Sequence, residues 1–575
     1  MMTATAFLLA ALSLVCERPE GWTFTTRESA DAGRAVHEIR LARAVEAPPP
    51  TFSVSFERPQ VDMHHTWFPH AEPDRCHLQA DRNGNYFSNL AFAMPLCTVL
   101  NDADGNRVTV AATEALREVK FKVGVVEAGD RVLFRLTFFT QPEAPRKGYA
   151  VKVLVDERAV RWDRAAAEAA EWIRRANGFE PAFAPESAYD PVYSTWYGFH
   201  QDVSAAAVEA ECAMGAKLGM KTLILDDGWQ LEGAGVGNYG NVGDWRPAPS
   251  KFPDMAAHVA AVRRLGYRYM VWFSVPMVGT ESAAYERFRG KCLYVNPAFP
   301  AGMLDPRFPE VRAHLAGTFE TAFRDWGLDG LKLDFIDWFK IPPTGDPAVR
   351  ENYAGRDIRS LPEAVDALMK EIRARLVAIR PDALVEFRQN YVGPAIRQYG
   401  NMLRATDCPG DMAGNRMRIA TLRVTSGTTP VHADMLEWHP SDTPANAARP
   451  ILNALFGVIQ YSMVLRDLPP AHRAVIAKWL AFSQEHREAL LRGTFTARHP
   501  ELGYPVLEGE SAAEKVVVVY SDAAFADLGR VAKPVYLVNA TARDGLMVVL
   551  DGEPRRLAVP KSEFIRLDPA GGERK

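Results

Sequence analysis

Charged side chains recur at the ends of short apolar segments in the middle of the chain. Gly330–Asp334 is an apolar run that ends in a carboxylate, and Lys332 shares a face with Asp334 because side chains alternate along a strand. Arg404 and Asp407 close another apolar run in a similar way. A lone aspartate in such a place most simply caps the next helix. Its repetition at several strand ends indicates instead a site like those at the carboxyl ends of barrel strands.

The side chains expected at these strand ends are aromatic, acidic or basic. They are Trp196, Tyr197, Asp226, Asp227, Trp229, Trp272, Lys332, Asp334, Glu386, Arg388, Arg404, Asp407, His432 and Asp434. Paired carboxylates with aromatic walls, and no phosphate-binding loop or nucleophile elbow, favour glycoside cleavage. In that reaction one ionised carboxylate acts on the anomeric carbon, and a protonated one donates to the leaving oxygen. A nearby cation lowers the first pKa, and burial raises the second.

The segments that must hold these side chains alternate strands with helical patterns, which is typical of a parallel sheet. The predicted strands are Val192–Tyr197, Thr222–Asp226, Tyr269–Val275, Gly330–Asp334, Leu384–Arg388, Met402–Asp407, Thr429–Asp434 and Gly457–Ser462. The amphipathic stretches between them include Val203–Leu218, Met255–Leu265, Pro309–Trp326 and Leu361–Ile379. Eight such strands predict a (β/α)8 TIM barrel. A doubly wound sheet is the alternative, but no glycine-rich GxGxxG or P-loop turn follows any strand.

Both flanks of the predicted barrel read as β structure. We therefore predict an α/β chain with an N-terminal β-sandwich domain at 1–180, the catalytic barrel at 181–495 and a small C-terminal β-sandwich domain at 496–575. The segment His64–His70 holds three histidines, but no cysteine or carboxylate lies within it at ligand spacing, so we predict no metal site. We interpret it instead as a loop that offers Trp67 to a neighbouring site.

Composition excludes several classes of partner. The 575 residues are 47% hydrophobic and 24% charged with a net charge of -4, so neither nucleic acid nor membrane is expected as a partner. Six cysteines without metal-ligand spacing favour a reduced, cytoplasmic protein. The apolar run Phe7–Val15 has the length of a signal peptide but lacks a preceding cation and a small-residue cleavage site. It predicts a β-strand, with export as the alternative.

Several motifs together resemble the α-galactosidases of glycoside hydrolase family 36. They are Leu225–Trp229, Gly243–Trp245 followed by Lys251–Pro253, and Leu331–Asp334. Arg404–Asp407, with His432–Met435 and His439–Pro440 after it, is similar to the raffinose- and stachyose-synthase branch. The order and spacing hold from about residue 190 to 465. The resemblance implies a barrel enzyme without cofactor or metal that acts on an oligosaccharide or glycoside, and a homo-oligomer is one expected state.

Residue roles follow from the same resemblance. It implies that Asp334 is the nucleophile and Asp407 the general acid/base of a retaining, exo-acting α-galactosidase. The substrate-binding residues that it implies, together with the strand-end pattern, are Trp196, Asp226, Asp227, Trp229, Trp272, Lys332, Arg388 and Arg404. Asp411, four residues past Asp407, is the competing candidate for the acid/base.

One segment departs from the family pattern. Glu386–Tyr391 replaces the Cys-Ser-Gly-Gly loop that helps to read the sugar's C2 and C3 substituents in many bacterial members. An α-N-acetylgalactosaminidase, or another α-glycosidase of the same mechanism, is therefore an alternative. A galactosyl transferase of the raffinose-synthase type is another, because it runs the same two steps with a sugar acceptor. A catalytically inactive carbohydrate-binding protein is the last, and the presence of all the expected site residues argues against it.

Overall fold

The computed structural model of the chain describes residues 12–17, 19–70, 76–230, 232, 239–342, 345–388, 390–569 and 572–574. It divides into two compact units: Met1–Phe179 with Gly393–Ala395, and Glu180–Val392 with Ile396–Lys575. The three-domain division at 1–180, 181–495 and 496–575 stays a prediction. Among the described helices, none has the length and the apolar composition that crossing a bilayer would require.

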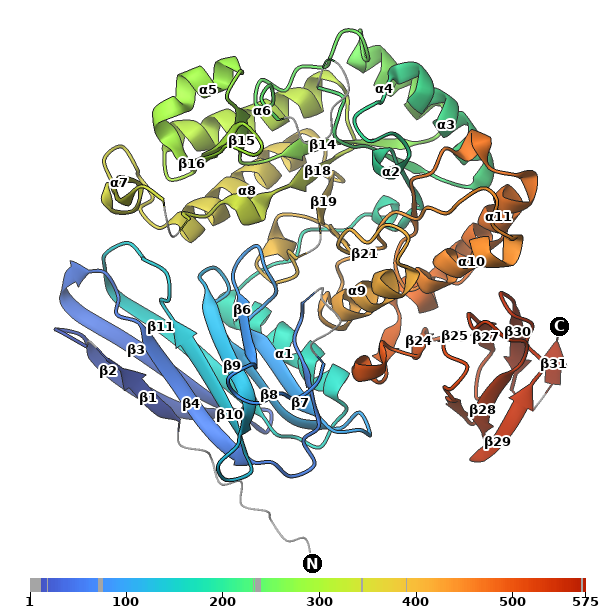
Figure 1. Ribbon diagram of the computed structural model, residues 1–575, viewed down its shortest axis with the longest axis horizontal. Helices are drawn as coiled ribbons and strands as arrows, with labels where there is room; N and C mark the ends of the chain where they lie inside the picture. The colour runs from blue at the N-terminus through green and yellow to red at the C-terminus, as the bar shows by residue number, and fades with distance from the viewer. Residues whose placement is uncertain are drawn as a thin grey trace, which may run out of the picture. The chain divides into compact units, whose positions relative to one another are not determined.

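The first unit is built on two antiparallel sheets, drawn in blue in Figure 1. Its described residues place β1 (Ser13–Cys16), β4 (Phe52–Pro59), β10 (Arg131–Phe138), β9 (Val119–Val126) and β6 (Asn85–Ser88) in one sheet. The other sheet orders β2 (Thr23–Asp31), β3 (Arg34–Ala47), β11 (Arg146–Asp156), β8 (Asn106–Ala112), β7 (Leu96–Leu100) and β5 (His65–Trp67). Alternate residues such as Phe134 and Val153 are buried in one shared apolar core. The predicted strand at Phe7–Val15 lies partly outside the described residues, and β1 begins at Ser13.

Trp67 does not form part of an exposed loop, so the interpretation that it is offered to a neighbouring site is wrong. It ends β5, is 1% exposed, and its ring lies 5.2 Å from that of Trp162 at the start of α1 (Trp162–Asn177). Burial against another large ring is the stable place for an indole. The neighbouring His64 and His65 both contact Asp102, at 3.0 and 2.7 Å.

The second unit contains a parallel barrel. Its described strands run in the order β21 (Val431–His432), β20 (Met402–Arg404), β19 (Leu384–Arg388), β18 (Gly330–Asp334), β14 (Arg268–Ser274), β13 (Thr222–Leu225), β12 (Val192–Ser194) and β22 (Gln460–Tyr461). The parallel bridges His432–Val458 and Leu436–Tyr461 link its two ends, so the barrel is nearly closed. Almost every strand residue is buried, as expected where helices cover one face and packed side chains fill the other.

Helices alternate with these strands along the chain, and most of them are drawn around the strands in Figure 1. They are α2 (Trp196–Phe199), α3 (Ala205–Leu218), α4 (Met255–Arg264), α6 (Pro309–Asp325), α7 (Pro347–Glu351), α8 (Leu361–Ile379), α9 (Met412–Thr425), α10 (Pro444–Asn453) and α11 (Pro470–Glu485). The local sequence fixes their ends. Ser204 caps α3 by accepting from the Ala207 amide, and Gly219 ends it at φ 103°, a conformation that glycine adopts without strain. Between β19 and β20 the described residues form only the turn η5 (Ile396–Gln398), in place of the long helix that a regular repeat would have.

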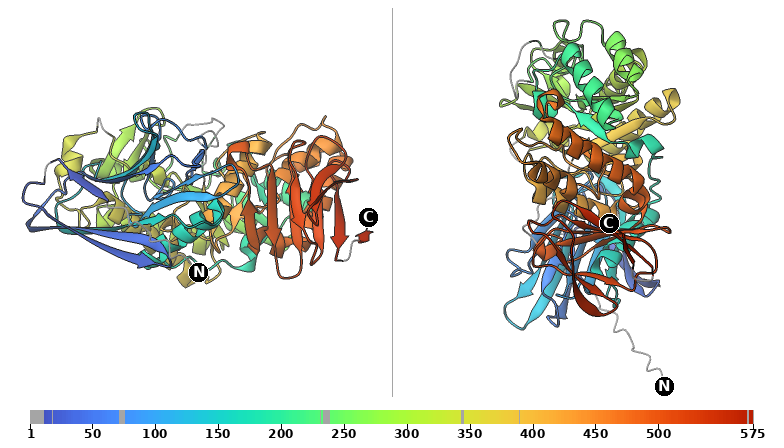
Figure 2. Two further views of the ribbon diagram at one scale, coloured as in Figure 1. Left: turned by 90° about the horizontal axis from the view of Figure 1, so that it is seen from below. Right: turned by 90° about the vertical axis from the view of Figure 1, so that its right-hand side faces the viewer.

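Two smaller β elements complete the second unit. A small sheet of β15 (Met277–Gly279), β17 (Ala301–Leu304) and β16 (Cys292–Asn296), with α5 (Ala283–Phe288), is inserted between β14 and α6. The C-terminal residues form one sheet of β23 (Thr494–Ala497), β24 (Val506–Glu510), β25 (Lys515–Val519), β27 (Val535–Asn539), β30 (Phe564–Asp568) and β31 (Gly572–Arg574), seen side by side in Figure 2. A second sheet holds β26 (Ala526–Gly529), β28 (Leu546–Leu550) and β29 (Glu553–Leu557), and a shared apolar core joins the two.

Candidate active site

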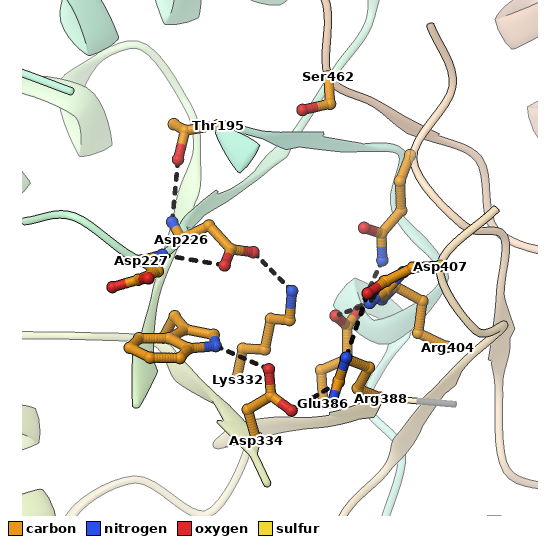
Figure 3. A network of polar contacts seen from close by, with 12 residues as sticks. Thr195, Asp226, Asp227, Lys332, Asp334, Glu386, Arg388, Arg404, Asp407 and Ser462 are labelled. Carbon is orange, nitrogen blue, oxygen red and sulfur yellow. Dashed lines mark hydrogen bonds and ion pairs between the residues drawn. The ribbon is translucent and has the colours of Figure 1, made fainter. Parts of the chain in front are cut away.

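A buried ion pair lies at the mouth of the barrel between β13 and β18. The Lys332 ammonium is 2.5 Å from Asp226 Oδ2, and both side chains are less than 5% exposed (Figure 3). Lys332 is the third residue of β18, and Asp226 follows the last residue of β13. The Asp226 amide donates to Thr195 Oγ1 at 3.0 Å, and its Oδ1 accepts from the Asp227 amide at 2.9 Å. Each carboxylate oxygen of Asp226 therefore has one donor, and Thr195 holds its backbone.

Asp227 is held by amides in place of a cation. Its two oxygens accept from Gln201 Nε2 and Gln230 Nε2, each at 2.6 Å. Burial raises the pKa of Asp227 to about 6, and the two hydrogen bonds oppose that rise. Gly228 follows at φ 116°, and a Cβ there would lie 2.5 Å from the Gln201 Cα, so only glycine lets the two segments approach.

Asp334, the last residue of β18, accepts three hydrogen bonds or ion pairs that fix its orientation. Trp272 Nε1 donates to Oδ2 at 3.0 Å, while the Phe335 amide at 2.7 Å and Arg388 Nε at 2.6 Å approach Oδ1. Phe335 has φ 63°, a left-handed conformation that is strained for a bulky residue. That strained turn points its amide at the preceding carboxylate.

Asp407 lies three residues past the end of β20 and pairs with two arginines. Arg404 Nη2 is 2.6 Å from its Oδ1, and Arg388 Nη1 is 3.1 Å from its Oδ2. Burial favours a higher pKa, but the charges of Arg404 and Arg388 outweigh it and hold the pKa of Asp407 below its usual range. The Asp407 side chain is 35% exposed, whereas that of Asp334 is 7% exposed. One carboxylate therefore lies deep in the site and the other at its opening.

Asp434 orients the surroundings of Asp407, although its place in the sequence predicted only a strand-end residue. Its carboxylate pairs with Arg404 and accepts from the Cys408 amide at 2.6 Å and from Tyr197 Oη at 2.8 Å. It is fully buried, and burial raises its pKa while Arg404 opposes that rise. Its position at the end of a predicted strand, three residues after Pro430-Val431, was the available signal.

Glu386 is a second strand-end residue that the predicted substrate-binding set left out. It is wholly buried in β19, and its Oε2 accepts from Gln460 Nε2 at 2.6 Å. The same Gln460 nitrogen lies 3.2 Å from His432 Nδ1. Burial raises the pKa of Glu386 to about 6 and lowers that of His432 to about 4, so at neutral pH the imidazole is uncharged while the Glu386 carboxylate stays mostly ionised, with Arg404 Nε 3.8 Å away.

The predicted aromatic residues divide into three cases. Trp272 contacts Asp334 directly through its indole nitrogen. Trp229 is fully buried: its nitrogen donates to the Trp272 carbonyl at 3.0 Å, and its ring packs on Trp245, so it supports the wall behind the site. Trp196 begins α2 and is half-buried with its ring 4.9 Å from His200, apart from the contacts that join the carboxylates.

Asp411, the competing acid/base candidate, has a structural place of its own. It is exposed and caps α9, with its Oδ1 accepting from the Gly414 amide at 2.8 Å. The geometry therefore favours Asp407 for contact with the site. No group of three or more His, Cys, Asp or Glu side chains that could hold a metal ion occurs within the described ranges.

Comparison with known proteins relates this arrangement to one family. A family model described as Melibiase matches residues 182–334, the barrel through β18. The chain is 28% identical over 151 residues to the α-galactosidase Mel36A of Lactobacillus acidophilus, covering 25% of this chain and 19% of that protein. It is 26% identical over 187 residues to an A type blood α-D-galactosamine galactosaminidase of Flavonifractor plautii, covering 29% and 16%. The matched segment spans less than a fifth of the length of these two curated relatives.

Solved structures extend the likeness to the rest of the chain. The GH36 α-galactosidase AgaA of Geobacillus stearothermophilus superimposes with a TM-score of 0.65 over 95% of this chain and 80% of that one, at 15% identity. The α-galactosidase of Lactobacillus brevis gives 0.62 over 87% and 71%, at 14% identity. The chain is similar in fold to the family 36 α-galactosidases. The expected barrel with flanking β regions is confirmed by this shared fold, while the likeness to the raffinose-synthase branch stays a prediction.

Proposed function

We propose that this chain is a retaining, exo-acting α-galactosidase that releases terminal α-D-galactosyl residues. The observation that carries the proposal is the pair Asp334 and Asp407, which come from different strands and are both in contact with Arg388. The relatives named as α-galactosidases support the choice of sugar. AgaA variants bound to raffinose and to stachyose support an oligosaccharide as the substrate class.

The proposed reaction has two steps. Asp334 attacks the anomeric carbon while Asp407 donates a proton to the glycosidic oxygen, and a galactosyl ester of Asp334 forms. Asp407 then takes a proton from water, which attacks the same carbon and releases galactose with its configuration retained. Asp334 suits the first role because three donors hold it in place deep in the site. Asp407 suits the second because it lies at the opening, where the leaving group departs.

The remaining side chains would bind the sugar without taking part in proton transfer. Asp226, Asp227 and Lys332 are buried at one side of the mouth and present carboxylate and ammonium groups to sugar hydroxyls. Trp272 both fixes Asp334 and offers an aromatic wall. Arg404 is fully buried and joins Asp407 to Asp434, so we assign it to orienting the acid/base.

The decisive test is hydrolysis of a panel of aryl α-glycosides by the wild type and by Asp334→Asn. The panel contains galactose, N-acetylgalactosamine, glucose and L-arabinopyranose as the glycone. We expect release from the α-galactoside, lost in the variant, and NMR of the first product formed should show the α-anomer. Initial release of the β-anomer would overturn the retaining mechanism.

Asp407→Asn tests the second carboxylate separately. A dinitrophenyl leaving group departs without protonation, whereas an alkyl or sugar leaving group needs an acid. The variant should therefore lose far more activity on raffinose than on dinitrophenyl α-galactoside. Equal losses on both substrates would assign the acid role to another group.

A second function, α-N-acetylgalactosaminidase, is favoured by one specific observation. Arg388, in the segment that departs from the family loop for the C2 and C3 substituents, lies beside Asp334, and the Flavonifractor relative is named for α-D-galactosamine, a sugar that also differs from galactose at C2. Release from the N-acetylgalactosaminide alone would keep the mechanism and change the substrate. A galactosyl transferase would instead give a trisaccharide from an activated galactoside and sucrose, with little free galactose.

A further inference from the structure

The guanidinium of Arg388 lies between the two carboxylates that the proposed reaction uses. Its Nε is 2.6 Å from Asp334 Oδ1 and its Nη1 is 3.1 Å from Asp407 Oδ2 (Figure 3). The guanidinium also stands over the Phe335 ring, 5.1 Å from its centroid. The anomeric carbon and the glycosidic oxygen must approach these same two carboxylates for the reaction to proceed. One arginine and the reacting atoms therefore require the same space.

We propose that Arg388 is a displaceable bridge, which neutralises the Asp334–Asp407 pair in the empty site and moves out from between them when a glycoside binds. Arg388 is then a positioning residue that acts through the two carboxylates. The inference rests on the function proposed above, since it assumes that both carboxylates serve one substrate.

The surrounding charges explain why Arg388, and not Arg404, would move. The charged and titratable groups that face Asp407 or Arg388 come from several elements. They are Arg404 of β20, Lys332 and Asp334 of β18, Asp337 after β18, Tyr391 after β19, Asp434 after β21 and Tyr197 of α2. In addition, Arg418 of α9 donates to the Asp407 carbonyl. Arg404 is fully buried and paired with Asp434 as well as Asp407. The Arg388 side chain ends its strand and is 16% exposed, whereas that of Arg404 is 0% exposed, so Arg388 is the arginine nearer to solvent.

Asp337 offers another carboxylate with which the Arg388 guanidinium could pair. Asp337, two residues past Phe335, accepts from Tyr391 Oη at 2.6 Å. Burial raises the pKa of Asp337, while the charge of Arg388 opposes that rise, so the two groups already interact. Moving toward Asp337 over the face of Phe335 would keep Arg388 next to a carboxylate and an aromatic ring, which limits the cost of leaving the bridge.

Displacement would also prepare the acid. Two arginine charges keep Asp407 ionised in the empty site, yet it must hold a proton to donate to the leaving oxygen. Removing one of the two charges lets Asp407 take a proton from water at a higher pH. Substrate binding would thus be coupled to protonation of the acid.

The first experiment compares the wild type with Arg388→Met as a function of pH. We expect the alkaline limb of kcat/KM to move up by about one to three pH units in the variant, because the free enzyme keeps its acid protonated further. A matched control is Arg375→Met on α8, whose arginine pairs with Glu371 and Glu320 away from the site. The alkaline limb of kcat/KM in the control variant should lie at the same pH as in the wild type. An unmoved limb in both variants would overturn the bridge.

Thermal unfolding tests the bridge without any substrate. A carboxylate whose pKa is lowered in the folded state stabilises the protein above its unfolded pKa, near 4, and this stabilisation is lost as the pH falls through the folded pKa. The deficit in Tm of Arg388→Met should therefore be largest at pH 7 and shrink below about pH 4. A deficit that stays constant with pH would mean that Arg388 only fills space, and would overturn the proposal.

Two inhibitors test the displacement itself. 1-Deoxygalactonojirimycin, which is bound in one AgaA structure, carries a positive charge when protonated, whereas galactose is neutral. Without Arg388 the carboxylate pair lacks its cation, so the ratio of the Kd for galactose to the Kd for the iminosugar should rise at least about tenfold. Arg388→Lys, which keeps a cation, should restore the wild-type ratio. Equal weakening of both ligands would make Arg388 a fixed sugar contact and overturn the displacement.

These outcomes separate the two proposals. The wild type could hydrolyse the α-galactoside while Arg388→Met changes neither the alkaline limb of the pH profile nor the Kd ratio. That result would contradict the bridge and support the proposed function. A wild type that neither hydrolyses nor binds any glycoside of the panel would sink the function. The pH dependence of unfolding would still report whether Arg388 joins the two carboxylates.

Discussion

The two halves of the barrel mouth stabilise their buried charges differently. The first half lies around Asp226 and Asp227, and the second around Asp334, Asp407 and Asp434. In the first half, Asp226 has one ammonium partner and Asp227 has two amide donors, all of them buried. In the second half, two arginines are shared among several carboxylates, including Asp334, Asp407 and Asp434. A buried one-to-one pair loses its only partner when either group moves, whereas a carboxylate that pairs with two arginines, as Asp407 does, keeps one of them when the other moves. The first half therefore suits recognition of a fixed sugar, and the second suits steps in which charge must move.

The difference also follows the sequence match. The Melibiase model covers residues 182–334, which include the first half of the mouth and end at Asp334. Arg388, Arg404 and Asp407 lie beyond it. The proposed nucleophile is thus the last residue of the segment that the family model describes, and the proposed acid/base belongs to the part with the shared arginines. Substitutions in the two halves should therefore have different effects on stability and on catalysis.

The largest effect is expected from Asp334→Asn, which removes the carboxylate of the proposed nucleophile. The amide cannot form the covalent intermediate, so kcat should fall by roughly 10³- to 10⁵-fold, as for a nucleophile that acts as part of a unit. Steady-state hydrolysis of an aryl α-galactoside measures it. Asp325→Asn, an exposed carboxylate at the end of α6 that pairs with Arg324, is the control and should keep activity within about tenfold of the wild type. Comparable losses in both would mean that the loss is not specific to the Asp334 carboxylate.

Lys332→Met should mainly damage the first half. It leaves Asp226 as an uncompensated buried charge, which costs about 3–5 kcal/mol in the free energy of unfolding. Urea unfolding followed by circular dichroism measures the cost. The double variant with Asp226→Asn removes both charges and should recover part of the loss. If the single variant were as stable as the wild type, the pair would not be buried as described.

Asp434→Asn should affect the second half more gently. The amide oxygen can still accept one hydrogen bond, but the charge that pairs with Arg404 is gone and the Cys408 amide competes for the same atom. Loss of one buried charge-assisted contact, about 1–3 kcal/mol, predicts roughly a 10- to 100-fold lower kcat. KM should change little, because Asp434 is fully buried. A rise in KM with an unchanged kcat would place Asp434 in sugar binding instead.

The sequence predicted the strands of the barrel well and the contacts between them only in part. Gly330–Asp334 and Leu384–Arg388 are observed with the predicted limits, because apolar runs buried on both faces are unambiguous. Met402–Asp407 was too long: the strand ends at Arg404, and the next three residues turn back so that Asp407 meets the same arginine. A period-2 pattern cannot show that turn, because an arginine and a carboxylate three residues apart fit either conformation.

The placement of Arg388 shows where sequence reasoning stops. Its type and its position at a strand end identified it as a site residue. Its two partners depend on the register of β19 against β18 and β20, where Lys332 lies beside Glu386 and Arg388 beside Arg404. Register between parallel strands is set by packing of the whole sheet and not by any local motif. The bridge could therefore be recognised only once the strands were assembled.

The smallest effect is expected from Asp411→Ala, which tests whether Asp407 or Asp411 donates the proton to the leaving group. Asp411 caps α9 through the Gly414 amide, so its loss should cost about 0.5–2 kcal/mol of stability. kcat and both limbs of the pH profile should stay unchanged. Ser204→Ala is a matched control, because Ser204 caps α3 through the Ala207 amide. A loss of about 100-fold or more in kcat for Asp411→Ala alone would transfer the acid role from Asp407 to Asp411, since a missing cap lowers stability in both variants but removes a proton donor in only one.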